Sequence, residues 1–121
     1  MTNRDIYLGA LTLIGDRPSS EGSDYEGRAR HLIPMALQTL APIDRILKRQ
    51  RGKAPARLLV IQVNMDKESP IEDELFSCAC YYLASELTAF EDAQLSEELF
   101  VRGEALRRIL SESIPFELKR M

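Results

Sequence analysis

Cys78 and Cys80 are the first residues to consider for chemistry, because thiolates bind metal ions and act as nucleophiles. They stand two apart in a stretch with helical spacing of apolar residues, so their side chains point roughly 200° apart around the axis. At that angle they cannot share a metal ion or form a relaxed disulfide. The chain has a single histidine, His31, so a zinc site within one subunit is not expected. We expect both thiols to be buried as small hydrophobic side chains.

The other reactive side chains form no catalytic pattern. His31 stands beside Arg30 and is expected at the surface of a helix, and Glu97 and Glu98 are adjacent, so they diverge around a helix rather than pair. The chain contains no phosphate-binding loop, no GxSxG, no HExxH and no CxxC. We therefore expect no enzyme, no cofactor and no metal site.

Composition and charge describe an ordinary folded domain. The chain has 121 residues, of which 45% are hydrophobic and 29% charged, and this length suits one domain with its own core. The net charge of −3 and the pI near 5.2 give no overall reason to bind nucleic acid or anionic membranes. No apolar run approaches the roughly 20 residues of a membrane span, and the N-terminus does not resemble a signal peptide. We expect a protein that stays in the cytoplasm where it is made.

The strongest pattern is a helical hairpin from Ser69 to Leu110. Ser69 and Glu72 form a capping box around Pro70, which predicts a helix start there. Apolar residues then recur every three or four positions, at Ile71, Leu75, Cys78, Ala79, Tyr82, Leu83, Leu87 and Phe90, with a second row at Phe76, Cys80 and Ala84. After a turn capped by Asp92, a last helix carries Leu95, Leu99, Leu106 and Leu110 inward. Gly103 lies on the same stripe and would allow a close approach between helices.

The first half of the chain predicts two more helices. Residues 3–14 form the first, with Thr2 or Asn3 as its cap and Gly15 as its left-handed end. After a loop at 16–22, a capping box of Ser23 and Glu26 opens a second helix that runs toward residue 40. Pro34 predicts a kink near residues 30–34, and Pro42 ends or bends the helix again, with one more turn at 43–47.

Residues 58–63 form the single convincing strand, because they are β-branched and flanked by residues that break regular structure. A lone strand needs a partner, either in a local hairpin or on a neighbouring subunit. The predicted fold class is therefore all-α: a small helical bundle built on a long helical hairpin, with one short β-strand or hairpin near 58–63. Residues 1–110 form one domain, and residues 111–121 form a tail that is flexible or docks on a partner.

Charge is divided along the chain. The basic segment holds Arg45, Lys48, Arg49, Arg51, Lys53 and Arg57 with no acid among them. It lacks interleaved aromatic residues for base stacking, so we interpret it as a solvated loop or a patch for an acidic partner protein. Between residues 66 and 98 the chain contains ten acidic residues and one basic residue, Lys67. Such polarity suits head-to-tail contacts between identical subunits.

The order of these segments resembles the head–tail connector (adaptor) proteins of tailed phages. The opening Ala-Leu-Thr-Leu-Ile-Gly-Asp at 10–16, a Ser/Gly loop, and a helix reaching Leu-Gln-Thr-Leu-Ala-Pro at 37–42 are similar to the start of that family. The run Tyr-Tyr-Leu-Ala-Ser-Glu-Leu at 81–87, a short acidic break and Glu-Ala-Leu at 104–106 are similar to its second half. The chain lacks the Trp that often follows the second helix in related tail-tube adaptors, which leaves the subfamily open.

The resemblance implies a virion structural protein of a phage or prophage. It would form a homo-oligomeric ring, commonly of twelve subunits, beneath the portal protein, extend the DNA channel without sequence-specific nucleic-acid contacts, and link head to tail. It would be found in the host cytoplasm during assembly and then at the head–tail junction of the virion, with no membrane partner. By analogy, residues 111–121 with Pro115, Phe116 and Leu118 would contact the portal. Residues 50–66 would contact a neighbouring subunit or the next connector or tail protein, and the basic partner-binding candidates are Arg49, Arg51, Lys53 and Arg57.

Two alternatives remain open at the level of sequence. One is a small DNA-binding regulator that uses the basic segment 45–57. The other is a bacterial helical adaptor that dimerises through the hairpin 71–110.

Overall fold

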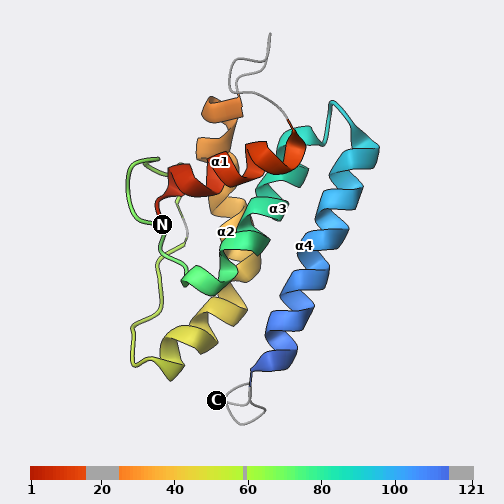
Figure 1. The fold of residues 1–121 in the computed structure, drawn as a ribbon. Helices are drawn as coiled ribbons and strands as arrows, with labels where there is room; N and C mark the ends of the chain where they lie inside the picture. The colour runs from red at the N-terminus through yellow and green to blue at the C-terminus, as the bar shows by residue number, and fades with distance from the viewer. Residues whose placement is uncertain (16–24, 59, 115–121) are drawn as a thin grey trace.

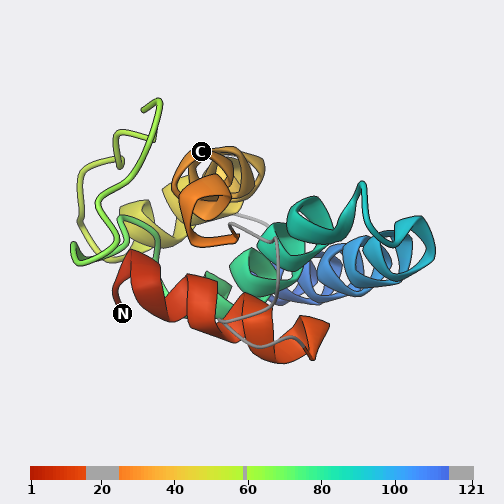
Figure 2. The same cartoon turned by 90° about the horizontal axis from the view of Figure 1, so that it is seen from above.

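A computed structural model of the chain describes residues 1–15, 25–58 and 60–114, and four α-helices make up most of them (Figure 1). The helices are α1 (Asn3–Ile14), α2 (Tyr25–Gln50), α3 (Phe76–Thr88) and α4 (Ala93–Ser113), and a single 3₁₀ turn, η1 (Asp73–Leu75), precedes α3. α3 packs against each of the other three helices, whereas α4 packs chiefly on α3. Seen from above, α4 lies at one side of the molecule, and the loop that follows α2 lies at the other (Figure 2). The predicted all-α class is confirmed.

α1 begins and ends where local sequence signals predict. The Thr2 hydroxyl accepts a hydrogen bond from the Asp5 N–H at 3.2 Å, and the Asp5 carboxylate accepts one from the Thr2 N–H at 2.8 Å, which completes a capping box. Gly15 closes the helix with φ of 74°, a left-handed conformation that glycine adopts without a steric penalty.

α2 continues through Pro42 to Gln50, so of the two predicted effects of Pro42, an end or a bend of the helix, the end is wrong. Its buried face runs without a break along the helix, through Ile33, Leu37, Leu40, Ile43 and Leu47. Burying each such side chain is worth about 1.5–3 kcal/mol, which together exceeds the roughly 3 kcal/mol that one internal proline costs. The helix changes direction in its second half, beyond the predicted position of the kink (Figures 1 and 2).

Pro34 leaves the carbonyl of Arg30 without its usual donor, and the chain supplies another. The Val63 N–H donates to that carbonyl at 3.0 Å, so the loop after α2 replaces the missing helical hydrogen bond. Pro42 is exposed, so solvent reaches the backbone around it. Of the capping box predicted to open α2, Ser23 lies outside the described residues, and Glu26 pairs with Arg4.

The predicted strand at 58–63 is wrong for the residues described there, which form an irregular loop along α2. The Gln38 amide donates to the Leu58 carbonyl at 3.4 Å, and Val63 bonds to α2 as described above. Further on, Ser69 N–H donates to the Met1 carbonyl at 2.9 Å, and one isolated antiparallel bridge joins Thr2 and Glu68. No second strand lies beside the loop among the residues described, and its polar groups bond to α2 and to the start of the chain.

α3 begins later than predicted, and the capping box expected at Ser69 and Glu72 is wrong. The helix starts at Phe76 after η1, and its N-cap residue Leu75 makes no side-chain capping bond. Glu72 instead turns into the protein, where it meets cationic side chains of α2.

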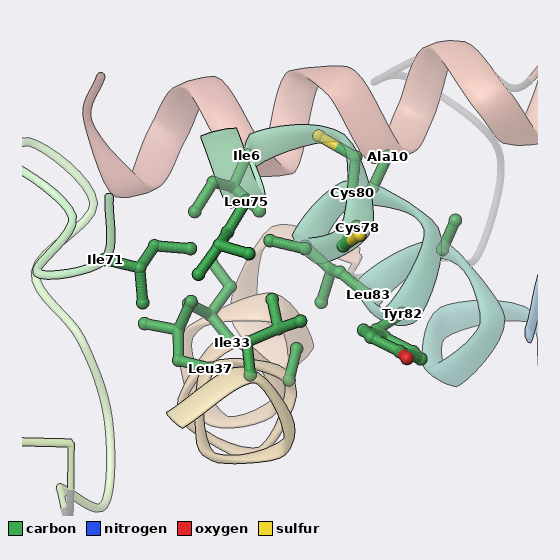
Figure 3. Packing of buried hydrophobic residues seen from close by; sticks show 14 of the residues in the cluster. Ile6, Ala10, Ile33, Leu37, Ile71, Leu75, Cys78, Cys80, Tyr82 and Leu83 are labelled. Carbon is green, nitrogen blue, oxygen red and sulfur yellow. The ribbon is translucent and has the colours of Figure 1, made fainter. Parts of the chain in front are cut away.

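The core lies between α1, α2 and α3 (Figure 3). Its central side chains are fully or almost fully buried and include Ile6, Ala10, Ile33, Leu37, Leu75, Cys78, Cys80 and Leu83. α1 crosses close to α3 at Gly9, where an added Cβ would stand 2.5 Å from the Cys80 sulfur. Any larger residue there would have to displace that side chain.

α4 meets α3 along a narrow contact. A Cβ at Gly103 would stand 3.1 Å from the Tyr81 Cβ, which confirms the predicted close approach of the two helices. Ser85 and Ser96 donate their hydroxyls to each other's carbonyls, both at 2.8 Å. Leu95, Leu106 and Leu110 are partly buried against the core, as their stripe predicted. α4 runs through Ser113 and Ile114 is buried, so the first residues of the predicted tail belong to the folded part.

Candidate functional site

The two thiols are unsuited to nucleophilic chemistry. Cys78 and Cys80 are free and buried, as predicted. Burial raises the pKa of Cys78 to about 11 and that of Cys80 to about 12, so both are protonated and poorly nucleophilic at neutral pH. No group of three or more His, Cys, Asp or Glu residues with metal-binding geometry occurs in the described ranges.

The most concentrated charges lie where the end of α2 meets the segment before α3. We call this cluster the clasp; it comprises Asp44, Lys48, Arg51 and Lys53 from α2 and the residues after it, with Glu72 and Glu74. Lys48 Nζ lies 2.9 Å from Asp44 Oδ1, 2.9 Å from Glu72 Oε2 and 2.6 Å from the Pro70 carbonyl oxygen. The Glu72 N–H donates to Asp44 Oδ1 at 2.8 Å. Apart from the pair of Lys48 and Asp44 within α2, these contacts join α2 to the segment that leads into α3.

Glu72 is the acceptor at the centre of the clasp. Besides Lys48, it accepts from Arg51 Nη1 at 2.6 Å and from Lys53 Nζ at 3.0 Å, while Arg51 also pairs with Glu74. Burial disfavours the charged form of Glu72, but the hydrogen bonds from the three cations outweigh it and lower its pKa to about 2. Arg51 likewise lowers the pKa of Glu74. With acids and bases balanced and hydrogen-bonded, the clasp is suited to holding two segments together rather than to moving protons.

The clasp uses part of the basic segment for contacts within the same chain. Arg51 and Lys53, two of the predicted partner-binding residues, bind acids of their own chain. Arg49 and Arg57 are exposed. Pro115, Phe116 and Leu118, the predicted portal-binding residues, lie outside the described residues. The basic and acidic segments therefore meet partly within one subunit, whereas the sequence suggested a solvated loop, a patch for an acidic partner or head-to-tail contacts between subunits.

The clasp was missed in the sequence, although one signal pointed to it. Asp44 and Lys48 stand four apart, and Asp44 falls on the apolar stripe of α2 between Leu40 and Leu47. A charged residue on a buried stripe needs a partner of opposite sign, and a base one turn later supplies it. The contribution of Glu72 could not be recognised, because a helical capping role explained it equally well.

An exposed surface follows one side of α2 and the loop after it. We call it the loop face; it comprises His31, Met35, Gln38 and Arg45 of α2, with Arg57, Val60 and Ile61. The bonds from Gln38 to Leu58 and from Val63 to Arg30 hold the loop beside this side of the helix. Ile61 is 86% exposed and Met35 is 55% exposed. The loop face therefore combines apolar side chains with arginines and contains no acid.

A second exposed surface is the outer side of α4. We call it the arm face; it comprises Glu97, Glu98, Val101, Arg102, Ala105 and Ile109. Of the 21 residues of α4, only Leu99 and Gly103 are buried. Val101 is 57% and Ile109 61% exposed, and a shallow groove lined by Gln94, Glu97, Glu98, Val101 and Arg102 lies at the acidic end. A helix packed so incompletely presents a long surface to other molecules.

Polar contacts fix α4 firmly despite this exposure. The Tyr82 hydroxyl donates to Glu104 Oε1 at 2.6 Å, and Arg107 Nη2 donates to Glu104 Oε2 at 2.6 Å. The Tyr82 and Phe100 rings lie 5.8 Å apart at a tilted angle. At the turn before α4, the Tyr25 hydroxyl of α2 donates to Glu91. These contacts connect α4, and with it the arm face, to α3 and α2.

A groove also lies between α1 and the start of α3. It is about 570 Å³ in volume and is lined by Met1, Asp5, Leu8, Gly9, Thr12, Asp73 and Phe76. It is wide and open, and a shape of this kind covers little of a small molecule. Over the described residues, no helix is both long and apolar enough to cross a membrane. Comparison of the chain with protein-family models, curated proteins and solved structures gave no match.

Proposed function

We propose that this protein is a head–tail connector of a tailed phage or prophage, in which a bundle built on the hairpin of α3 and α4 assembles as a ring beneath the portal. The observation that carries the proposal is the arm face, since α4 is 21 residues long and buries only two of them within its own subunit. A helix that is held on its own subunit by hydrogen bonds and a ring contact, yet is mostly exposed, is typical of a protein that functions by binding neighbouring molecules. The order of segments along the sequence, which resembles that of head–tail connector proteins, indicates the kind of assembly.

The two alternatives are less well supported. The basic segment is less suited to a DNA-binding regulator than its composition suggests, because three of its six cations, Lys48, Arg51 and Lys53, bind acids of the clasp. A helical adaptor that dimerises through α3 and α4 would also use the arm face. It differs from a connector in its partner, because it would not bind a portal ring.

Binding to the portal protein of the same phage or prophage tests the proposal. The full chain should migrate with the portal ring in sedimentation or size-exclusion experiments. A variant that ends after Ile114 should lose this binding and keep its thermal midpoint. The truncation begins at Pro115 because Ile114 is buried and belongs to the core.

A full-length variant tests the same contact without shortening the chain. Phe116→Ser with Leu118→Ser keeps the length and charge of the tail but removes its apolar side chains, and it should weaken portal binding as the truncation does. Full-length protein that fails to bind the portal would contradict the connector proposal. Portal, protease and capsid genes directly upstream would support it independently, whereas an isolated chromosomal setting would count against it.

A further inference from the structure

We infer that the arm face of one subunit binds the loop face of a second copy, in a head-to-tail contact that uses two different surfaces of the chain. The inference rests on the proposed function, because a ring requires such a contact, and it names the surfaces that form it. The two faces lie at opposite sides of the molecule: α4 at one side, and the loop after α2 at the other (Figures 1 and 2). Because the two surfaces lie on opposite sides, the same contact can repeat from one subunit to the next.

The charges of the two faces are complementary at one end. The arm face carries adjacent exposed carboxylates at Glu97 and Glu98, beside the shallow groove. The charged side chains of the loop face are arginines, and Arg45 and Arg57 are exposed and form no ion pair with an acid among the residues that the structure describes. Opposite charges that meet in this way select the partner surface and its register.

The apolar residues are complementary at the other end. Ile109 of the arm face is 61% exposed, and Met35 and Ile61 of the loop face are also more than half exposed, whereas Val101, which is 57% exposed, lines the groove at the acidic end. Burying side chains of this size contributes about 25 cal/mol per Å² of apolar surface removed from water. The contact would therefore gain stability from the apolar end and specificity from the charged end.

The spacing of the two patterns also matches. At 1.5 Å per residue, Glu98 lies about 16 Å from Ile109 along α4, and Arg45 lies about 15 Å from Met35 along α2. Pairing Glu98 with Arg45 and Ile109 with Met35 places the two helices antiparallel.

Charge reversal on each face separately tests the contact. Glu97→Lys/Glu98→Lys should abolish the concentration-dependent self-association of the chain in analytical ultracentrifugation, and Arg45→Glu/Arg57→Glu should do the same. The control Glu86→Lys changes an exposed acid outside both faces and should self-associate like the wild type. Circular dichroism and thermal midpoints establish that each variant is folded.

Mixing the two double variants distinguishes head-to-tail from symmetric pairing. Each variant keeps one intact face, and the two altered faces now carry exchanged charges. A mixture should therefore regain association, and the quadruple variant carrying both exchanges should assemble alone.

Three results would overturn the contact. One is a wild-type chain that stays monomeric at the highest attainable concentration. Another is an Arg45→Glu/Arg57→Glu variant that associates normally while the arm-face variant does not, since this would indicate that α4 pairs with α4. The last is a mixture that fails to associate. Self-association through these faces without portal binding would refute the proposed function alone, whereas portal binding without this contact would refute the inference alone.

Discussion

Replacing Lys48 with Met removes the buried cation of the clasp while nearly keeping the length of the side chain. Asp44 would then remain 2% exposed with a carboxylate that has lost its ion pair, and the Pro70 carbonyl would lose a donor at 2.6 Å. Removing one partner of a buried ion pair costs about 3–5 kcal/mol. Because domains of this kind have a total stability of about 5–15 kcal/mol, we expect a large fall in the free energy of unfolding.

A second variant shows whether the unpaired charge causes the loss. In Asp44→Asn/Lys48→Met, the Asn oxygen can still accept the Glu72 N–H that Asp44 accepts at 2.8 Å, but no unpaired carboxylate remains at this position. We expect this double variant to be more stable than Lys48→Met, so the two changes should be strongly non-additive. Glu74→Gln is the matched control. It removes a clasp acid whose side chain is 38% exposed, and we expect it to cost at most about 1 kcal/mol.

Urea unfolding at neutral pH, followed by circular dichroism, measures five proteins: the wild type, the three variants above and the single variant Asp44→Asn. The slope of the transition should stay constant, so that a shift in midpoint reports stability. A loss below about 1 kcal/mol for Lys48→Met, or strict additivity with Asp44→Asn, would refute the view that the clasp is a buried and mutually dependent unit.

The remaining predictions concern pH, packing and thiol reactivity. The pKa of Glu72 falls from 4.5 to about 2 on folding, so its contribution to the free energy of unfolding is complete above pH 4.5 and is lost as the pH falls toward 2. After allowance for solvent screening, the free energy of unfolding measured by urea titration should fall by about 2 kcal/mol across this range. Gly9→Ala places a Cβ 2.5 Å from the Cys80 sulfur, and the resulting overpacking, typically about 1–3 kcal/mol, should lower the thermal midpoint. Adding Cys80→Ala should restore that midpoint; no recovery would mean that another contact limits the site. Cys78 and Cys80 should react with a thiol reagent only as fast as the protein opens, so rapid labelling of the folded protein would contradict their burial.

Features with local causes could be predicted from the sequence. The limits of α1 follow from Thr2, Asp5 and Gly15, which stand within or beside the helix they cap. The close contact at Gly103 follows from its place on the apolar stripe of α4. In each case the determining residues lie within about one turn of the feature.

Features with distant partners could not be predicted. Glu72 fits a capping box equally well, and its actual role depends on Lys48, which is 24 residues earlier in the chain. α2 passes through Pro34 because the bond lost at Arg30 is replaced by Val63. The β-branched run at 58–63 would favour a strand, but the described part of the chain places no other strand beside it. Local propensity was overridden wherever tertiary contacts supplied or withheld a partner.

The proline in α2 has a consequence for engineering the protein. Replacing helical prolines is a common way to raise stability, since it restores the missing backbone bond. Here the restored N–H at position 34 would compete with Val63 for the Arg30 carbonyl. The helix would become more regular, while the loop carrying Val60 and Ile61 would lose an anchor. The missing helical hydrogen bond at Pro34 is thus needed to hold the loop in place. A variant selected only for thermal stability would lose the arrangement of this loop on the surface.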